Sequence, residues 1–87
     1  MEVIFERRFE KSIKLAKKRG KDISKAELAI EMLRLQKPLP TRMKDHLLIG
    51  NYRGMRECKL EPDWLLIYRI EGSILFIIDT GTHSDLF

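Results

Sequence analysis

Two residues suited to acid–base chemistry, Asp63 and His83, stand at the ends of two strongly apolar segments of this 87-residue chain. Asp63 precedes residues 64–70, and His83 follows residues 74–79. Glu71-Gly72 separates these two β-rich segments, which is a tight-hairpin signal. A hairpin would bring Asp63 and His83 to one end of a sheet, where a rigid scaffold can present them to solvent. The alternative interpretation is that Asp63 lies in an ordinary turn and His83 in a frayed chain terminus.

His46 is the other of the two histidines, and it lies in a polar, loop-like stretch. Histidine is the only side chain whose ordinary pKa lies near neutrality, so His46 and His83 are the default acid–base candidates. Aromatic residues able to stack on bases and cations able to hold phosphates lie nearby. The aromatic residues are Tyr52, Trp64 and Phe87, and the cations are Arg53, Arg56 and Lys59. The alternative is that these side chains only form an ordinary core and a solvated surface.

The charge is uneven along the chain, which has a net charge of +4 and a pI of about 9.4. Residues 1–21 sum to +5 and residues 37–59 to +4, whereas residues 22–36 sum to −1 and residues 60–87 to −4. Two basic segments in a small domain favour a polyanionic partner, with nucleic acid first and an acidic protein second. The alternative is a soluble, solvated surface.

Two helices are expected in the first half of the chain, after a short first strand at residues 2–5. Apolar residues recur at helical spacing between lysines over residues 9–18, which predicts a basic amphipathic helix that Gly20 ends. Ser24 and Glu27 have the spacing of a capping box and predict a second helix to about residue 36, before two prolines.

The second predicted helix is unusually apolar. Its polar stripe consists only of Glu27, Glu31 and Arg34, so most of its circumference should be covered. The first helix and a sheet could cover two sides of this second helix, which favours packing in the core. A protein partner that covers its remaining surface fits the same pattern.

The second half predicts strands. Residues 36–50 form a loop rich in proline and basic residues. Residues 52–60 alternate, with Glu57 and Lys59 on one face and Arg56 and Cys58 on the other, and predict a half-exposed strand. Residues 64–70 and 74–79 predict buried central strands. The order β-α-α-β-β-β predicts an α+β fold, a mostly antiparallel four-stranded sheet with two helices packed on one face.

The length predicts a single domain spanning residues 1–87. The longest apolar runs fall far short of the roughly 18 residues of a membrane span, so we expect no membrane association. Cys58 is the only cysteine and cannot form an internal disulfide, which favours a reducing cytoplasm. No Cys/His cluster has metal-ligand spacing, so we expect neither a metal nor a cofactor.

Several spaced motifs together resemble the YafQ branch of the RelE/ParE toxin superfamily. They cover residues 44–87 closely, whereas the helical half is similar in length and order only. The motifs are Lys44-Asp45-His46-Leu47, Gly50-Asn51-Tyr52-Arg53-Gly54, Arg56-Glu57-Cys58, Glu61-Pro62-Asp63-Trp64-Leu65-Leu66-Ile67-Tyr68 and Thr80-Gly81-Thr82-His83-Ser84-Asp85-Leu86-Phe87.

The resemblance implies a RelE-like fold and a type II toxin that cleaves mRNA on the ribosome without a metal. It implies that His83 is the general acid and that His46 is a general base or a substrate-positioning group. It also implies that Asp63 is a carboxylate that orients a histidine or assists proton transfer. RNA-binding roles would fall to Lys59, Arg53, Arg56, Lys44 and Phe87. Trp64 also matches, but its place in the strand favours a core role.

This chain differs from the family pattern at two positions. Lys59 stands where relatives often have a further histidine, and Asp79 stands where a basic residue is common. Lysine is a poor base at neutral pH, so Lys59 is expected to hold a phosphate instead.

The partners that the resemblance implies are mRNA on the ribosome and a cognate acidic antitoxin that covers the active face or the basic helices. Operator DNA would be bound only through the antitoxin complex. One alternative is a non-catalytic ParE-like toxin that binds a topoisomerase, against which His46, Asp63 and His83 argue. A second is a DNA-binding co-repressor module, for which basic charge suffices.

Overall fold

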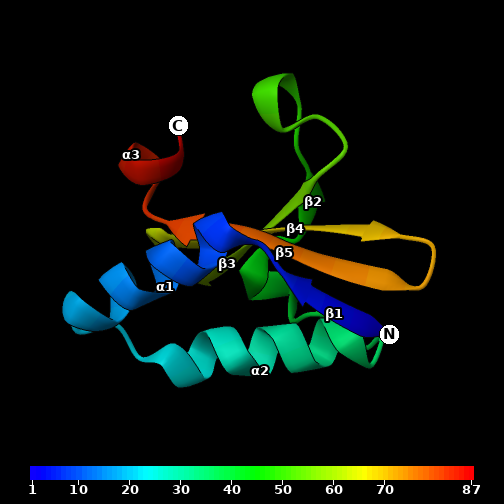
Figure 1. Ribbon diagram of the computed structural model, residues 1–87, viewed down its shortest axis with the longest axis horizontal. Coiled ribbons are helices and arrows are strands. Elements are labelled where there is room, and N and C mark those ends of the chain that lie inside the picture. The colour runs from blue at the N-terminus through cyan, green and yellow to red at the C-terminus, as the bar shows by residue number, and fades with distance from the viewer.

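The computed structural model describes residues 1–87 and has a five-stranded sheet with two helices on one face (Figure 1). The strand order is β1-β5-β4-β3-β2, in which β1 and β5 are parallel and the other neighbours are antiparallel. The predicted α+β class is confirmed. The strands are β1 (Glu2–Phe5), β2 (His46–Leu47), β3 (Arg56–Glu61), β4 (Trp64–Glu71) and β5 (Ile74–Gly81), and the helices are α1 (Arg7–Lys18), α2 (Ile23–Arg34) and α3 (His83–Leu86).

The two long helices form where the sequence predicts them, with shifted ends. Helix α1 begins at Arg7, two residues before the predicted start. Helix α2 is capped by Asp22 rather than by Ser24, because the Asp22 carboxylate accepts hydrogen bonds from both the backbone N–H and the hydroxyl of Ser24. It ends at Arg34, two residues before Gln36, which has a positive φ of 59°.

The predicted four strands are five in the structure. His46 and Leu47 lie in what was expected to be a loop and pair with Glu57 and Arg56 as the short edge strand β2. Strand β3 begins at Arg56 rather than at residue 52, because Gly50 and Gly54 have φ values of 73° and 86° and turn the chain before it. Tyr52 therefore belongs to a 3₁₀ turn, Gly50–Tyr52, in the loop that joins β2 to β3.

The hairpin of β4 and β5 forms the centre of the molecule. Leu66, Tyr68, Leu75 and Ile77 point toward the helices and pack with Phe9 and further apolar residues in the main core. Trp64 is buried against Ala16 and Ala26, which confirms its expected core role.

The helical layer leaves part of α2 uncovered. Leu28 of α2 and Leu35 just beyond it are exposed, whereas Ala26, Ala29 and Leu33 are buried, so the apolar surface of this helix is covered in large part but not fully. No helix of the structure has both the length and the apolarity needed to cross a membrane.

The opposite face of the sheet carries the β2–β3 loop and α3 instead of long helices (Figure 1). Leu65 and Ile67 of β4 are fully buried on this face. We call it the open face.

Candidate active site on the open face

Asp63 and His83 meet at one end of the sheet, as the hairpin predicts. Asp63 lies in the β3–β4 turn, and His83 is the first residue of α3. Asp63 Oδ1 accepts a hydrogen bond from the His83 backbone N–H at 2.9 Å and lies 2.6 Å from His83 Nδ1. These two hydrogen bonds, the backbone one first, lower the pKa of Asp63. With Nδ1 engaged, Nε2 is the ring atom available to a substrate.

The short helix α3 holds His83 in place. Thr82 caps it, because its hydroxyl accepts from the Asp85 N–H while the Asp85 carboxylate accepts from the Thr82 N–H. Arg19, which follows α1, donates to Asp85 Oδ2 at 2.8 Å, and these contacts lower the pKa of Asp85 to about 2. The alternative of a frayed terminus was therefore wrong, since residues 82–85 are tied to each other and to the end of α1.

His46 has a different pair of partners. Its Nδ1 lies 2.6 Å from the carbonyl oxygen of Lys44, so the neutral ring carries its proton on Nδ1 and donates it there. Its Nε2 lies 3.6 Å from Oε2 of Glu57, whose side chain is only 7% exposed. A buried carboxylate is costly without a partner, and Glu57 lies close enough to pair with the His46 ring when that ring carries a second proton.

Two residues, Tyr68 and Arg56, anchor the segment that carries His46. The Tyr68 hydroxyl donates to Asp45 Oδ1 at 2.5 Å, and Arg56 Nε donates to the same oxygen at 3.2 Å. Burial raises the pKa of Tyr68, so its hydroxyl remains a donor. These contacts fix Asp45, which precedes His46 in the chain. Lys44, on the other side of Asp45, has left-handed backbone geometry with a φ of 48°.

The strand register places the site residues on one face. His46, Glu57, Ile67 and Asp79 are successive cross-strand partners from β2 to β5, and their side chains share the open face. Lys59 pairs with Leu65, which pairs with Gly81, one step nearer to Asp63 and His83. Arg56 alternates with Glu57 and projects from the helix-covered face. The structure therefore brings Lys59 toward the two histidines and separates Arg56 from them.

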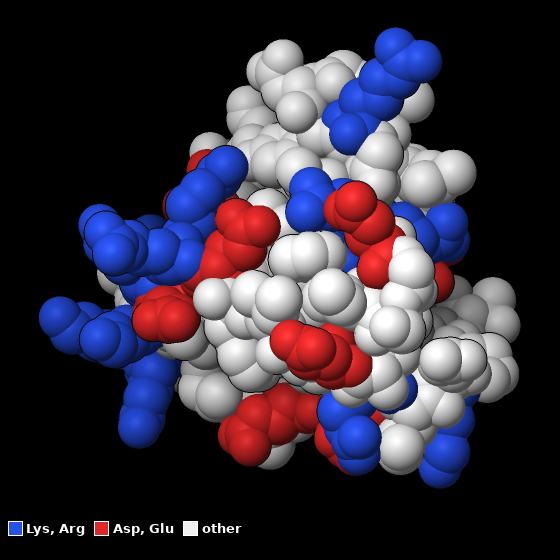
Figure 2. All heavy atoms as spheres, turned by 45° about the vertical axis from the view of Figure 1, so that its right-hand side comes forward, with Lys and Arg blue, Asp and Glu red and all other residues white.

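Lys59 and Lys44 also line a hollow beside β3. Lys25 of α2 and Arg42 contribute two more cations, and Glu61 contributes one carboxylate, which already pairs with Lys21 and Lys25. Figure 2 shows Lys and Arg side chains around the margin of the molecule, most densely on its left, and acidic side chains among uncharged ones nearer the centre.

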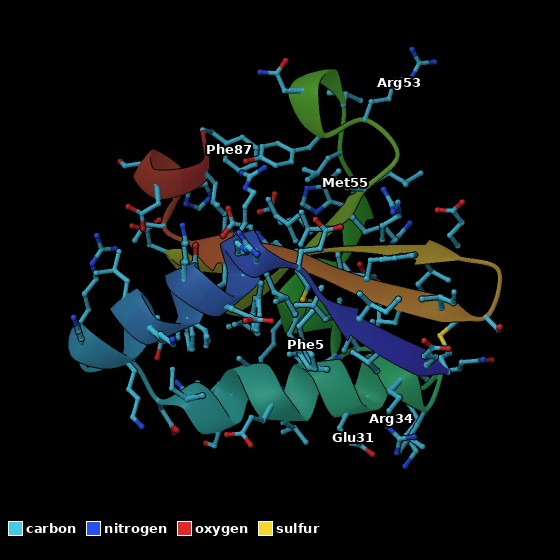
Figure 3. The ribbon with its side chains drawn as sticks, in the orientation of Figure 1. Phe5, Glu31, Arg34, Arg53, Met55 and Phe87 are labelled. Carbon is cyan, nitrogen blue, oxygen red and sulfur yellow. The ribbon has the colours of Figure 1, made fainter.

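Tyr52 and Phe87 form an aromatic pair above the sheet. Their rings lie 5.3 Å apart at 71°, and the Tyr52 hydroxyl donates to the Leu86 carbonyl at 3.2 Å. Phe87 lies between α3 and the β2–β3 loop, whereas Arg53 stands at the outer end of that loop (Figure 3). Phe87 is 63% exposed and offers a free ring surface for stacking.

The sequence analysis left Glu57, Tyr68 and Asp45 without a role. Glu57 lies on the same face of the predicted strand as Lys59, and this alternation was the one feature of the sequence that could have indicated a site role for Glu57. Nothing local connects Tyr68 to Asp45, because the contact joins β4 to the segment before β2. No three His, Cys, Asp or Glu side chains converge closely enough to ligate a metal ion.

The fold and the site together define a small α+β protein that presents a histidine–carboxylate pair on the sheet face opposite its long helices. The model of the family described as "Bacterial toxin of type II toxin-antitoxin system, YafQ" matches residues 1–87. The chain belongs to this family, which confirms the resemblance drawn from the motifs.

Named relatives and solved structures agree with this membership. The mRNA interferase toxin YafQ of Escherichia coli K12 is 42% identical over 80 residues, which are 91% of this chain and 87% of that protein. The crystal structure of YafQ from E. coli BL21(DE3) superposes with a TM-score of 0.95 at 38% identity, covering 99% of this chain and 97% of that one. YafQ in the E. coli DinJ–YafQ complex gives 0.91 at 39% identity, covering 99% and 97%.

Proposed function

We propose that this chain is the toxin of a type II toxin–antitoxin pair and acts as an mRNA interferase that cuts mRNA on the ribosome. The observation that carries the proposal is the Asp63–His83 pair. One carboxylate oxygen orients the histidine through its backbone and its ring, and Nε2 remains free for a substrate. The 42% identity to a named mRNA interferase toxin supports the same activity.

The reaction would be transfer within the RNA backbone. The ribose 2′-OH attacks the adjacent phosphorus, the bond from phosphorus to the 5′ oxygen breaks, and a 2′,3′-cyclic phosphate and a 5′-OH remain. His46 Nε2 takes the proton of the 2′-OH, and His83, protonated on Nε2, gives a proton to the leaving 5′ oxygen. Asp63 holds the His83 ring in position for this proton transfer, as the aspartate orients the histidine of a Ser-His-Asp triad.

The remaining site residues would hold the RNA. Lys59, whose strand register lies between those of His46 and of the Asp63–His83 end, is placed to hold the reacting phosphate as a fixed positive charge. Lys44 extends the positive charge into the hollow beside β3. Phe87 offers its ring to a base, and Arg53 projects far enough from the loop to reach ribosomal RNA. Arg56 would act indirectly, through Asp45, on the position of His46.

The proposed partner is an acidic antitoxin encoded beside this chain, by analogy with the DinJ–YafQ complex. Operator DNA would be reached only through that complex, and the setting would be the cytoplasm, where the ribosomes are. The ParE-like alternative is less well supported, because binding to a topoisomerase requires no oriented histidine.

The test uses purified protein, ribosomes programmed with a defined mRNA, and primer extension to map cuts. We expect cleavage that gives a 2′,3′-cyclic phosphate and a 5′-OH. A message with a 2′-deoxy nucleotide at the mapped cut should remain intact there, because the nucleophile is missing. Cleavage of the deoxy message, or none of the normal message, contradicts the proposal.

A further inference from the structure

Asp79 is a nearly buried carboxylate at the edge of the proposed site. Its side chain is 8% exposed and ends the cross-strand row that begins at His46. Its Oδ1 accepts from the Thr80 N–H at 2.8 Å, and its Oδ2 lies 3.1 Å from Arg8 Nη2. An acid here would repel an RNA phosphate, so the cation that neutralises it determines the charge of this end of the site.

Arg8 is that cation, and it keeps unused donors. The same Nη2 also donates to the Tyr52 hydroxyl at 3.2 Å. Since a guanidinium has five N–H donors, Nη1 and Nε remain available, and the Arg8 side chain is 60% exposed. A guanidinium is charged at any physiological pH, and the hydrogen bond with Tyr52 is the largest cause of a further rise in the pKa of Arg8.

The position of Arg8 in its helix also favours a role outside the fold. It is the second residue of α1, where the helix dipole disfavours a cation. Tyr52, its partner, stacks edge-on against Phe87, the proposed base contact. Arg8 therefore presents charged N–H donors beside an aromatic ring, which is the chemistry that binds a nucleotide phosphate next to a stacked base.

We propose that Arg8 is an RNA-phosphate-binding residue of this site, held in place by Asp79 and Tyr52. This inference rests on the proposed function. The occupant is a phosphodiester of the mRNA next to the nucleotide that stacks on Phe87. Helix α1 thus contributes directly to the open face, although it lies on the other side of the sheet.

The test measures binding of the His83→Ala protein, which leaves the message uncut, to programmed ribosomes at several salt concentrations. Adding Arg8→Ala should weaken binding and reduce the slope of log K against log salt by about one, because one phosphate contact is lost. Arg7→Ala is the matched control, since Arg7 is an exposed neighbour with no ion pair or side-chain hydrogen bond. It should leave the slope unchanged. Arg8→Lys should keep the slope but bind more weakly than the parent, because an ammonium retains the charge and loses the planar group that can hold Asp79 and Tyr52 while donating to a phosphate.

A second variant separates phosphate binding from neutralisation of Asp79. Arg8→Ala with Asp79→Asn removes both charges, so no buried carboxylate is left unpaired. If Arg8 binds phosphate, the double variant still shows the reduced slope. Recovery of the parent slope and affinity would show that Arg8 only neutralises Asp79 and would overturn the inference. If the parent chain does not cut mRNA at all, the proposed function fails and this inference fails with it.

Discussion

Replacing His83 with alanine should remove cleavage while preserving the fold. A positioned acid or base contributes about 10²–10⁴-fold to a rate, which corresponds to about 3–5 kcal/mol of the activation barrier. We therefore expect single-turnover cleavage at saturating programmed ribosomes to fall by at least a hundredfold, and growth arrest on expression to disappear.

The structure predicts that this loss is specific to the chemistry. The hydrogen bond from the residue 83 backbone N–H to Asp63 Oδ1 survives the substitution, and so do the reciprocal bonds of Thr82 and Asp85. The lost ring contact joins two exposed side chains, at 53% and 64%, where solvent screens it. The melting temperature and antitoxin affinity should stay close to those of the parent protein.

Two outcomes would refute this reasoning. Growth arrest by soluble His83→Ala protein would contradict the enzymatic function. A loss of cleavage much smaller than a hundredfold, with normal binding, would mean that His83 positions the substrate rather than donating a proton.

Four further predictions follow from other parts of the structure. Lys59→Ala should weaken ribosome binding and reduce the salt slope by about one, and an unchanged slope with a saturated rate as low as that of His83→Ala would place Lys59 in the chemical step. The acidic product of the neighbouring reading frame should raise the melting temperature at saturation, and no rise would exclude it as the partner. The pKa of Asp85 is lowered from 3.8 to about 2, so its pairing with Arg19 should stabilise the fold above pH 4 and lose that effect as the pH falls through 2. Asp85→Asn should therefore flatten the dependence of the free energy of unfolding on pH between these values. An unchanged pH dependence would contradict the pairing. Burial raises the pKa of Cys58 to about 12, so an alkylating reagent should label it in urea but not in the native protein at pH 8, and rapid native labelling would show that the core opens.

The Asp63–His83 pair was predictable because it depends on a local feature. Once Glu71-Gly72 marks a hairpin, the register of β4 and β5 brings the residues flanking the two strands together. The helices were predictable from periodicity, but the cap of α2 was not. Asp22 and Ser24 both favour a cap position, and only the fold decides between them.

Contacts between distant segments were beyond local patterns. The alternation of β3 correctly put Lys59 and Arg56 on different faces, yet both were expected to hold phosphates. The structure shows that only Lys59 shares a face with His46, because β2 fixes which face is open. A strand as short as β2 carries no periodicity of its own. The cap of α3, in contrast, was present in the sequence as Thr82 and Asp85.

The parallel pairing of residues 2–5 with residues 74–77 has a consequence for synthesis of the chain. A nascent polypeptide has no partner for β1 until β5 has emerged from the ribosome, since the contact closes almost the whole sequence into one loop. Such long-range pairing is slow to form and leaves apolar residues such as Phe9, which is buried in the folded core, exposed in the meantime. During that interval α1 is not seated on the sheet, and Arg8 has no Asp79 to contact. A toxin built in this way completes its site only after nearly all of it has been translated, which leaves time for a pre-made antitoxin to bind it as it folds.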